Sequence, residues 1–451
     1  MSGEHAHSTS RDPRPLPRQI LALAVPALGA LVAEPAFLLA DTVILGRLGV
    51  EELAGAALGI TVMQTVTGLM IFLAYSTTPA VARYIGAGKT AQALASGRDG
   101  LWLAAILGVV LAVLGLLGGS ALLRAMGGTG NVHAYAWDYL LWSLPGFVGI
   151  LLVFAATGVL RGMQDTTTPL IVAGVGFGAN IVLNVVLVHG VGLGVAGAAI
   201  GTSIAQWGMA LVYLRILVPR LRAHQVGLRL HGAGLKAAFS VGWWMLLRTL
   251  SLRVAIVATV LVATDLGDDA LAAHQVVFTV FSTLAFILDA LAIAAQALIG
   301  KELGASRKHD ARRLTRVMTL WGLGFGVITG AVIALAAPFG SGLFTPDAQV
   351  ASMITAALFV VAAAQPIAGY VFVLDGVLMG AGDVRYLAVA GIVNLAVYLP
   401  VLWWIAQRGL SGSDAIVWLW IGFAVVFIGA RALTLGVRAA GERWMVLGEA
   451  R

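Results

Sequence analysis

Long apolar runs, each about the length needed to cross a bilayer, follow one another along almost the whole chain. A membrane-spanning helix needs about 20 predominantly apolar residues, and the 451-residue sequence holds twelve such runs. Gly and Pro at the joints, such as Gly127-Gly128 and Pro346, mark the turns between them. The predicted spans are 18–45, 53–82, 99–122, 134–160, 168–189, 195–218, 236–264, 270–299, 314–339, 350–378, 386–406 and 414–437. This pattern predicts an all-α polytopic membrane protein with twelve transmembrane helices.

The first half of the chain recurs in the second half at a fixed offset of 218 residues. Twelve identical pairs follow this offset without a gap, from Gly49 and Gly267 to Asp165 and Asp383. Six helices in each half is an even number, so the halves have the same orientation in the membrane. We therefore expect two six-helix bundles related by a pseudo-two-fold axis along the membrane normal. Such an architecture favours a carrier that works by alternating access.

The repeat and the charges together give the expected domain limits. We expect a cytosolic N-terminal tail at 1–17, a first lobe at 18–218, a cytoplasmic connection at 219–235, a second lobe at 236–438 and a cytosolic C-terminal tail at 439–451. Residues 1–17 lack the apolar core of a signal peptide.

Composition excludes an ordinary soluble domain and accounts for the basic balance. Hydrophobic residues make up 60% of the chain and charged residues 11%, whereas soluble domains carry roughly 25% charged residues. With both termini inside, all but five of the 28 Lys and Arg residues lie at or near the cytoplasmic side; the exceptions are Arg47, Arg124, Arg248, Arg253 and Arg408. This is the positive-inside pattern. It explains the net charge of +7 without a nucleic-acid partner.

Two carboxylates lie within the first apolar run. Glu34 and Asp41 are seven residues apart, and therefore two turns apart on one helix face. A charge at mid-membrane costs at least about 2.5–3.5 kcal/mol on insertion scales, so a retained carboxylate suggests a role with ions, protons or substrate. No Lys or Arg in the first six helices lies at mid-membrane to pair with Asp41. Glu34, nearer the inner surface, is open between a functional and a solvated role.

Amide and hydroxyl groups in the fifth and sixth helices come in pairs four residues apart, each pair on one helix face. Together with Asp41 they can supply oxygens to Na⁺, or a hydrogen-bond network that responds to protonation of Asp41. Hydrogen bonds that merely join helices are the structural alternative. The pairs are Asn180 with Asn184 and Thr202 with Gln206.

The second half carries charges that can pair internally. Arg248 and Arg253 lie in the seventh helix, Asp289 in the eighth and Asp375 in the tenth. We expect these four to form ion pairs. The carboxylates without a cationic partner then lie in the first half.

The motifs of common enzymes are absent. The sequence holds no H-E-x-x-H and no G-x-S-x-G, which argues against an intramembrane hydrolase. Gly88-Lys89-Thr90 ends like a phosphate-binding loop, but Arg83 occupies the position of the first Gly. The G-x-G-x-x-G match from Gly192 to Gly197 follows a membrane helix rather than a strand. We therefore expect no enzymatic activity, no metal cofactor and no nucleotide.

From about residue 16 to 440 the sequence resembles the multidrug and toxic compound extrusion (MATE) family, and within it the DinF-like branch. The residues that carry the likeness are Pro26-Ala-Leu, Glu34-Pro35, Asp41-Thr42 with Gly46, Leu48 and Gly49, Ala54, Arg161-Gly162 with Asp165, and the stretch from Leu288 to Gln296. The resemblance implies export of amphipathic, often cationic compounds through a cleft between two lobes, driven by return of H⁺ or Na⁺. It also implies a multi-pass protein of the cell membrane that can work as a monomer.

The resemblance further implies that Asp41 is the coupling site, completed by Asn180, Asn184 and Thr202 for H⁺ or for Na⁺, and we expect helix 1 to bend at Pro26. Some relatives carry a second carboxylate at the position of Asn184, so its absence here favours H⁺. Three alternatives remain open at this point. They are a lipid-linked precursor flippase of the same superfamily, which would need a strongly cationic cleft; an ion channel, which would need a continuous polar pore; and a membrane scaffold.

Overall fold

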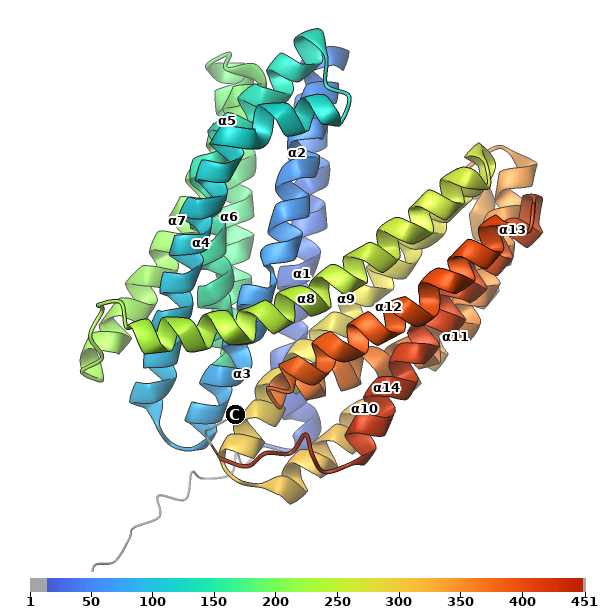
Figure 1. Ribbon diagram of the computed structural model, residues 1–451. Coiled ribbons are helices and arrows are strands. Elements are labelled where there is room, and N and C mark those ends of the chain that lie inside the picture. The colour runs from blue at the N-terminus through green and yellow to red at the C-terminus, as the bar shows by residue number, and fades with distance from the viewer. Residues whose placement is uncertain (1–13, 449–451) are drawn as a thin grey trace, which may run out of the picture. The chain divides into compact units, whose positions relative to one another are not determined.

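The computed structural model describes residues 14–448, except for the side chains of Glu34 and Ala36, and in this range the chain is helical without a β-strand (Figure 1). The helices of the first half are α1 Leu16–Gly46, α2 Val50–Met70, α3 Phe72–Gly86, α4 Thr90–Ala125, α5 Gly130–Gly162, α6 Thr167–Val185, the π-helical turn η1 Val186–Gly190 and α7 Gly194–Ala223. Those of the second half are α8 Gly232–Asp265, α9 Asp268–Gly304, α10 Lys308–Gly340, the 3₁₀ turn η2 Ser341–Leu343, α11 Ala348–Gly380, α12 Val384–Ala406, α13 Gly412–Trp420, the π-helical segment η3 Ile421–Phe427 and α14 Ile428–Ala440.

The prediction of twelve membrane-spanning helices is confirmed. The described residues form 12 segments that are long and apolar enough to cross a bilayer, and each predicted span lies inside one of them. The predicted spans differ most from the helices at the starts of α4 and α10. There the helices begin at Thr90 and Lys308, whereas the predicted spans begin at 99 and 314. Polar residues continue these helices beyond their apolar runs, so hydropathy marks the membrane portion and not the helix end.

Contacts divide the described chain into two compact units, which we call unit 1 and unit 2. Unit 1 is Ala22–Gly242, and unit 2 is Trp243 to the C-terminal end together with the start of α1 up to Leu21. Each unit therefore contains six of the membrane-spanning segments. The stretch 224–231 between α7 and α8 is not helical. It is held on α4 within unit 1, because Arg98 and Trp102 donate hydrogen bonds to the carbonyls of Gly227 and Leu228, each at 2.9 Å.

One helix forms the centre of each unit, α5 in unit 1 and α11 in unit 2. Helix α5 packs against α2, α3, α4 and α7, and α11 packs against α9, α10, α13 and α14. Small residues permit these close approaches. A side chain at Gly158 would collide with the backbone of Ala74, and one at Gly376 with the backbone of Ala292. Gly158 and Gly376 are related by the 218-residue offset, so both units use the same crossing.

The repeat seen in the sequence is also present in the helix bounds. A shift of 218 residues maps the start and end of α5 onto those of α11, and maps Val50 and Gly86 onto the ends of α9. It also maps one helix-ending turn onto another: Gln164 (φ 66°) and Gly382 (φ 70°) are both left-handed. In each turn three consecutive backbone N–H groups donate to the last carbonyls of the helix, which closes α5 and α11 alike.

Candidate functional site

Asp41 lies near the end of α1 and is held against α6. Three contacts set the register of the two helices: Gly29 leaves room for Leu170, the rings of Phe37 and Phe177 stack with centroids 5.3 Å apart, and Asp41 meets Asn184. The residue numbers rise together along both helices, so α1 and α6 run parallel at this contact. The Asp41 side chain is thereby placed inside unit 1, where it is 3% exposed.

A neutral amide is the hydrogen-bond partner of the Asp41 carboxylate. Asn184 Nδ2 donates to Asp41 Oδ1 at 2.5 Å and to Asn180 Oδ1 at 2.9 Å. Both asparagines are buried, at 0% and 2% exposure, and they share one face of α6 as their spacing predicts. Among residues 14–448, Asp41 makes no ion pair with a Lys, Arg or His. A buried carboxyl group with this surrounding has no fixed positive charge to hold it ionised.

Helix α7 closes the site from the other side of α6. Gly201 has no side chain at the place that the Asn184 Oδ1 atom occupies, which lets the amide point toward Asp41. The Oδ1 atom of Asn184 and the Thr202 hydroxyl are buried and have no hydrogen-bond partner among the described residues. The Thr202 hydroxyl lies near the Tyr139 side chain of α5, and Tyr139 is in turn a neighbour of Asp41. Thr202 is therefore linked to the Asp41 site by way of Tyr139, which neighbours both residues.

Gln206, one turn further along α7, is directed elsewhere. Its side-chain carbonyl lies where a side chain at Gly146 of α5 would be, and the backbone of Gln206 packs against Gly149. No contact joins Gln206 to Asp41 in the part of the chain that the structure describes. Its neighbours Ser203 and Trp207 bond the carbonyls of Trp142 and Pro145 on α5. The Gln206 region thus serves the packing of α5 on α7.

Pro26 and Glu34 lie in the same helix as Asp41. Pro26 has no N–H to donate to the carbonyl of Ala22, and the hydroxyl of Thr166 donates to that carbonyl at 3.4 Å instead. Helix α1 is continuous from Leu16 to Gly46, and the bend at Pro26 stays a prediction. The backbone of Glu34 is helical, but its side chain lies outside the described residues, so its role stays open too.

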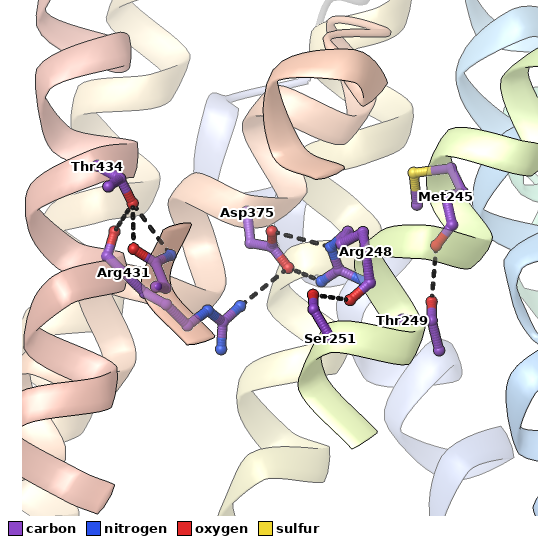
Figure 2. Close-up of polar contacts among 8 residues, drawn as sticks. Met245, Arg248, Thr249, Ser251, Asp375, Arg431 and Thr434 are labelled. Carbon is purple, nitrogen blue, oxygen red and sulfur yellow. Dashed lines mark hydrogen bonds and ion pairs between the residues drawn. The ribbon is translucent and has the colours of Figure 1, made fainter. Parts of the chain in front are cut away.

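Unit 2 also buries a carboxylate, Asp375, but this one is paired with arginine side chains. Asp375 on α11 accepts hydrogen bonds from Arg248 on α8 through both carboxylate oxygens, the Nε to Oδ1 bond being 3.3 Å. Arg431 on α14 approaches Oδ2 at 3.4 Å (Figure 2). Asp375, Arg248 and Arg431 are all buried. Two guanidinium groups thus stabilise the negative charge of Asp375.

The expectation that Arg253 joins this pairing is wrong. Its side chain is exposed, and it forms no ion pair with any carboxylate of the described chain. Five residues separate Arg253 from Arg248, which turns it by about 140° around the helix, away from the face that meets Asp375. Asp289 is half-buried on α9 and is not its partner.

The two halves of the chain match one family model. The model, described as MatE, covers residues 26–186 and 245–404, and so most of both units. The chain belongs to this family, the MATE multidrug efflux transporters. Relatives agree: it is 30% identical to "Protein DETOXIFICATION 45, chloroplastic" of Arabidopsis thaliana over 94% of this chain and 78% of that protein. It is 25% identical to "Probable multidrug resistance protein NorM" of Idiomarina loihiensis over 93% of each chain.

Solved MATE structures share the fold. The crystal structure of the Vibrio cholerae MATE transporter VcmN in the bent form matches with a TM-score of 0.84 and 25% identity, covering 95% of this chain and 98% of that one. A MOP superfamily transporter from Pyrococcus furiosus also matches with a TM-score of 0.84, at 22% identity over 95% of this chain and 96% of that one. The family places the chain among transporters of small molecules rather than among enzymes.

In this MATE chain, sequence reasoning missed two residues, Tyr139 and Arg431. Tyr139 is counted among apolar residues and interrupts no hydrophobic run, so its hydroxyl gave no signal. The one available hint was its position within the fourth predicted span, near the start of that span. Arg431 lies late in the last apolar run and was assigned to the cytoplasmic side by the positive-inside pattern. Its contact with Asp375 depends on the packing of α14 on α11, which no spacing rule reveals.

Proposed function

We propose that this chain exports amphipathic, often cationic compounds across the cell membrane in exchange for H⁺, with Asp41 as the coupling group. The observation that carries the proposal is the buried carboxylate of Asp41, whose hydrogen-bond partner is the neutral amide of Asn184. Such a group gains a stabilising partner either by taking up a proton or by meeting a cationic substrate, because burial disfavours its isolated charge. The two events therefore compete.

This competition is sufficient for antiport by alternating access. With the site open inward, the deprotonated carboxylate binds the cationic part of a substrate. With the site open outward, protonation of Asp41 removes the negative charge and releases the substrate. One proton that returns down about 100 mV supplies about 2.3 kcal/mol, or about 50-fold in concentration gradient. A pH gradient adds to that.

The choice of H⁺ over Na⁺ rests on the ligands around Asp41. Sodium prefers several oxygen ligands, and Asn184 presents its N–H rather than its carbonyl to the carboxylate. Asn184 Oδ1 and Thr202 Oγ1 are buried oxygens without a donor among the described residues, but Oδ1 points to Gly201. Na⁺ would require the amide of Asn184 to turn over.

The proposal includes the finer family and cellular assignments. The helix 1 motif around Asp41, together with Asn180 and Thr202, supports the DinF-like branch, and Asn184 is the position where some relatives differ by carrying a carboxylate. The distribution of Lys and Arg supports cytoplasmic termini in the cell membrane. Six spans in each unit supply a complete repeat pair in one chain, which supports a monomer.

The lipid-linked precursor flippase is the second candidate, and it depends on the cations of unit 2. A flippase of this kind needs positive charge that is available to a pyrophosphate. Arg248 and Arg431, the buried arginines at Asp375, are both bound to that carboxylate. Arg253 is the other arginine of α8 and is exposed without an ion pair to any described carboxylate. One such cation does not make the strongly cationic cleft that a flippase needs, so the pairing at Asp375 favours drug export.

The test is flux of ethidium in proteoliposomes, with the pH gradient and the Na⁺ gradient imposed separately, for the wild type and Asp41→Asn. We expect flux that follows the pH gradient and is lost in Asp41→Asn, with normal membrane insertion of the variant. Undiminished flux in the variant would rule out Asp41 as the coupling group. Flux that follows only the Na⁺ gradient would overturn the choice of ion, and no flux under either gradient would favour the flippase.

A further inference from the structure

The first two turns of α10 carry a basic patch on one exposed face. His309, Arg312, Arg313 and Arg316 have the spacing i, i+3, i+4 and i+7, which places them on the same side of the helix, and all four are exposed. We call these four residues the α10 basic patch. The same helix then continues into the membrane span with large exposed apolar side chains, namely Leu320, Val327, Ile328, Val332, Leu335 and Phe339.

Neighbouring carboxylates neutralise only part of the positive charge at this end of α10. Glu442, in the segment after α14, accepts hydrogen bonds from Arg312 and Lys308, each at 2.8 Å, and these bonds lower the pKa of Glu442. Arg307 is bound by Glu302 at 2.6 Å, and Asp310 lies 3.9 Å from His309. Arg313 and Arg316 have no hydrogen-bond or ion-pair partner among residues 14–448. Two guanidinium groups therefore remain available to a ligand.

The repeat shows that the fold does not require this patch. The positions 218 residues earlier, on α4, are Ala91, Leu94, Ala95 and Arg98. Arg98 is occupied, because it pairs with Asp99 at 2.7 Å and bonds the Gly227 carbonyl. The same helix turns in unit 1 therefore form without an unpaired cation at any of these four positions. The patch is a property of unit 2 alone.

We propose that the α10 basic patch binds the phosphate of an anionic phospholipid in the cytoplasmic leaflet, whose acyl chains lie along the exposed apolar face of α10. Arginine matches phosphate because its guanidinium donates two parallel hydrogen bonds. The patch lies at the junction of the polar start and the apolar run of α10, which is the depth of lipid headgroups when this end faces the cytoplasm. An anionic lipid matches both features of α10, because its headgroup is negative and its acyl chains are apolar. Free phosphate matches only the arginines.

The experiment uses the full chain in detergent, titrated with short-chain phosphatidylglycerol, with short-chain phosphatidylcholine and with inorganic phosphate. Bound lipid is counted by native mass spectrometry. The test variant is Arg313→Gln with Arg316→Gln. The matched control is Arg215→Gln with Arg222→Gln, which also removes two exposed arginines from one face, here at the end of α7. All four side chains are exposed, so both double variants keep the fold.

We expect phosphatidylglycerol to bind more tightly than phosphatidylcholine, and the Arg313/Arg316 variant to lose about tenfold or more in that affinity. The control variant keeps wild-type binding. An equal loss in both variants would reduce the effect to general surface charge, and no loss in the test variant would exclude the patch; either result overturns the proposal. Inorganic phosphate that binds the patch as tightly as the lipid would overturn the lipid assignment. Because the readout is lipid binding, these outcomes are independent of transport by Asp41.

Discussion

Asp41 and Asp375 are both carboxylates buried inside membrane-spanning helices, and they differ in what surrounds them. Asp375 lies between Arg248 and Arg431, whereas Asp41 accepts one hydrogen bond from the uncharged Asn184. A carboxylate between two guanidinium groups stays ionised and ties three helices together. A carboxylate beside an amide can lose its charge without leaving an uncompensated partner. The difference assigns a structural role to Asp375 and a titrating role to Asp41.

The repeat sharpens this comparison, because the equivalents of the Asp41 site in unit 2 carry no charge. The 218-residue offset maps Asp41 onto Thr259 and Asn180 onto Tyr398. The hydroxyl of Thr259 donates to the carbonyl of Ala255, so Tyr398 donates to Thr259, at 2.7 Å. The Tyr398 ring packs against Phe423 and Phe427. The same helices thus pack well with two hydroxyl groups and an aromatic cluster, which means that packing alone does not require a carboxylate at this position.

The largest expected effect comes from the same substitution at the two carboxylates. Asp375→Asn removes the counter-charge of Arg248 and Arg431, and loss of one partner from a buried ion pair costs about 3–5 kcal/mol. Asp41→Asn leaves no buried charge behind, so we expect a change in stability within about 1 kcal/mol. Thermal unfolding of the two purified variants in one detergent measures both. Equal destabilisation would remove the distinction between the two sites.

An intermediate effect is expected at Gly201, which gives Asn184 its room. In Gly201→Ala the new methyl group would occupy the place of Asn184 Oδ1, so the amide must turn away from Asp41. Overpacking of this kind costs about 1–3 kcal/mol, and we expect slower proton-driven ethidium flux. Gly208→Ala on the same helix is the control, since nothing lies within 4 Å of its added carbon. Full proton-driven flux in Gly201→Ala would show that the Asn184 contact is dispensable.

The smallest effect is expected at the unit 2 equivalents. Tyr398→Phe removes one donor to Thr259, whose own hydroxyl still bonds Ala255. We expect a loss of about 0.5–1.5 kcal/mol in stability and no change in the dependence of transport on pH. Flux measured from pH 5 to 8 checks this. A shifted pH profile would bring unit 2 into the coupling reaction.

Much of the architecture follows from the sequence because bilayer thickness fixes the length of apolar runs. The twelve spans, the 218-residue repeat and the shared helix face of Asn180 and Asn184 needed no three-dimensional information. The Arg248 and Asp375 pair was also predictable, since buried opposite charges in one bundle have few other partners. Features that depend on helix rotation and packing could not be predicted in this way. The expected pairing of Arg253 is wrong because Arg253 lies on another face of α8 than Arg248. The position of Gln206 against α5, and the contacts of Tyr139 and Arg431, depend on how whole helices are placed.

The most direct test of Asp41 as the coupling group is proton release on substrate binding. Ethidium is added to purified protein in weakly buffered detergent solution, and protons released are counted against ethidium bound, with Asp41→Asn titrated to the same bound amount. The account predicts about one proton per ethidium for the wild type and for Tyr398→Phe, and none for Asp41→Asn. Release of the same number of protons by Asp41→Asn would contradict it.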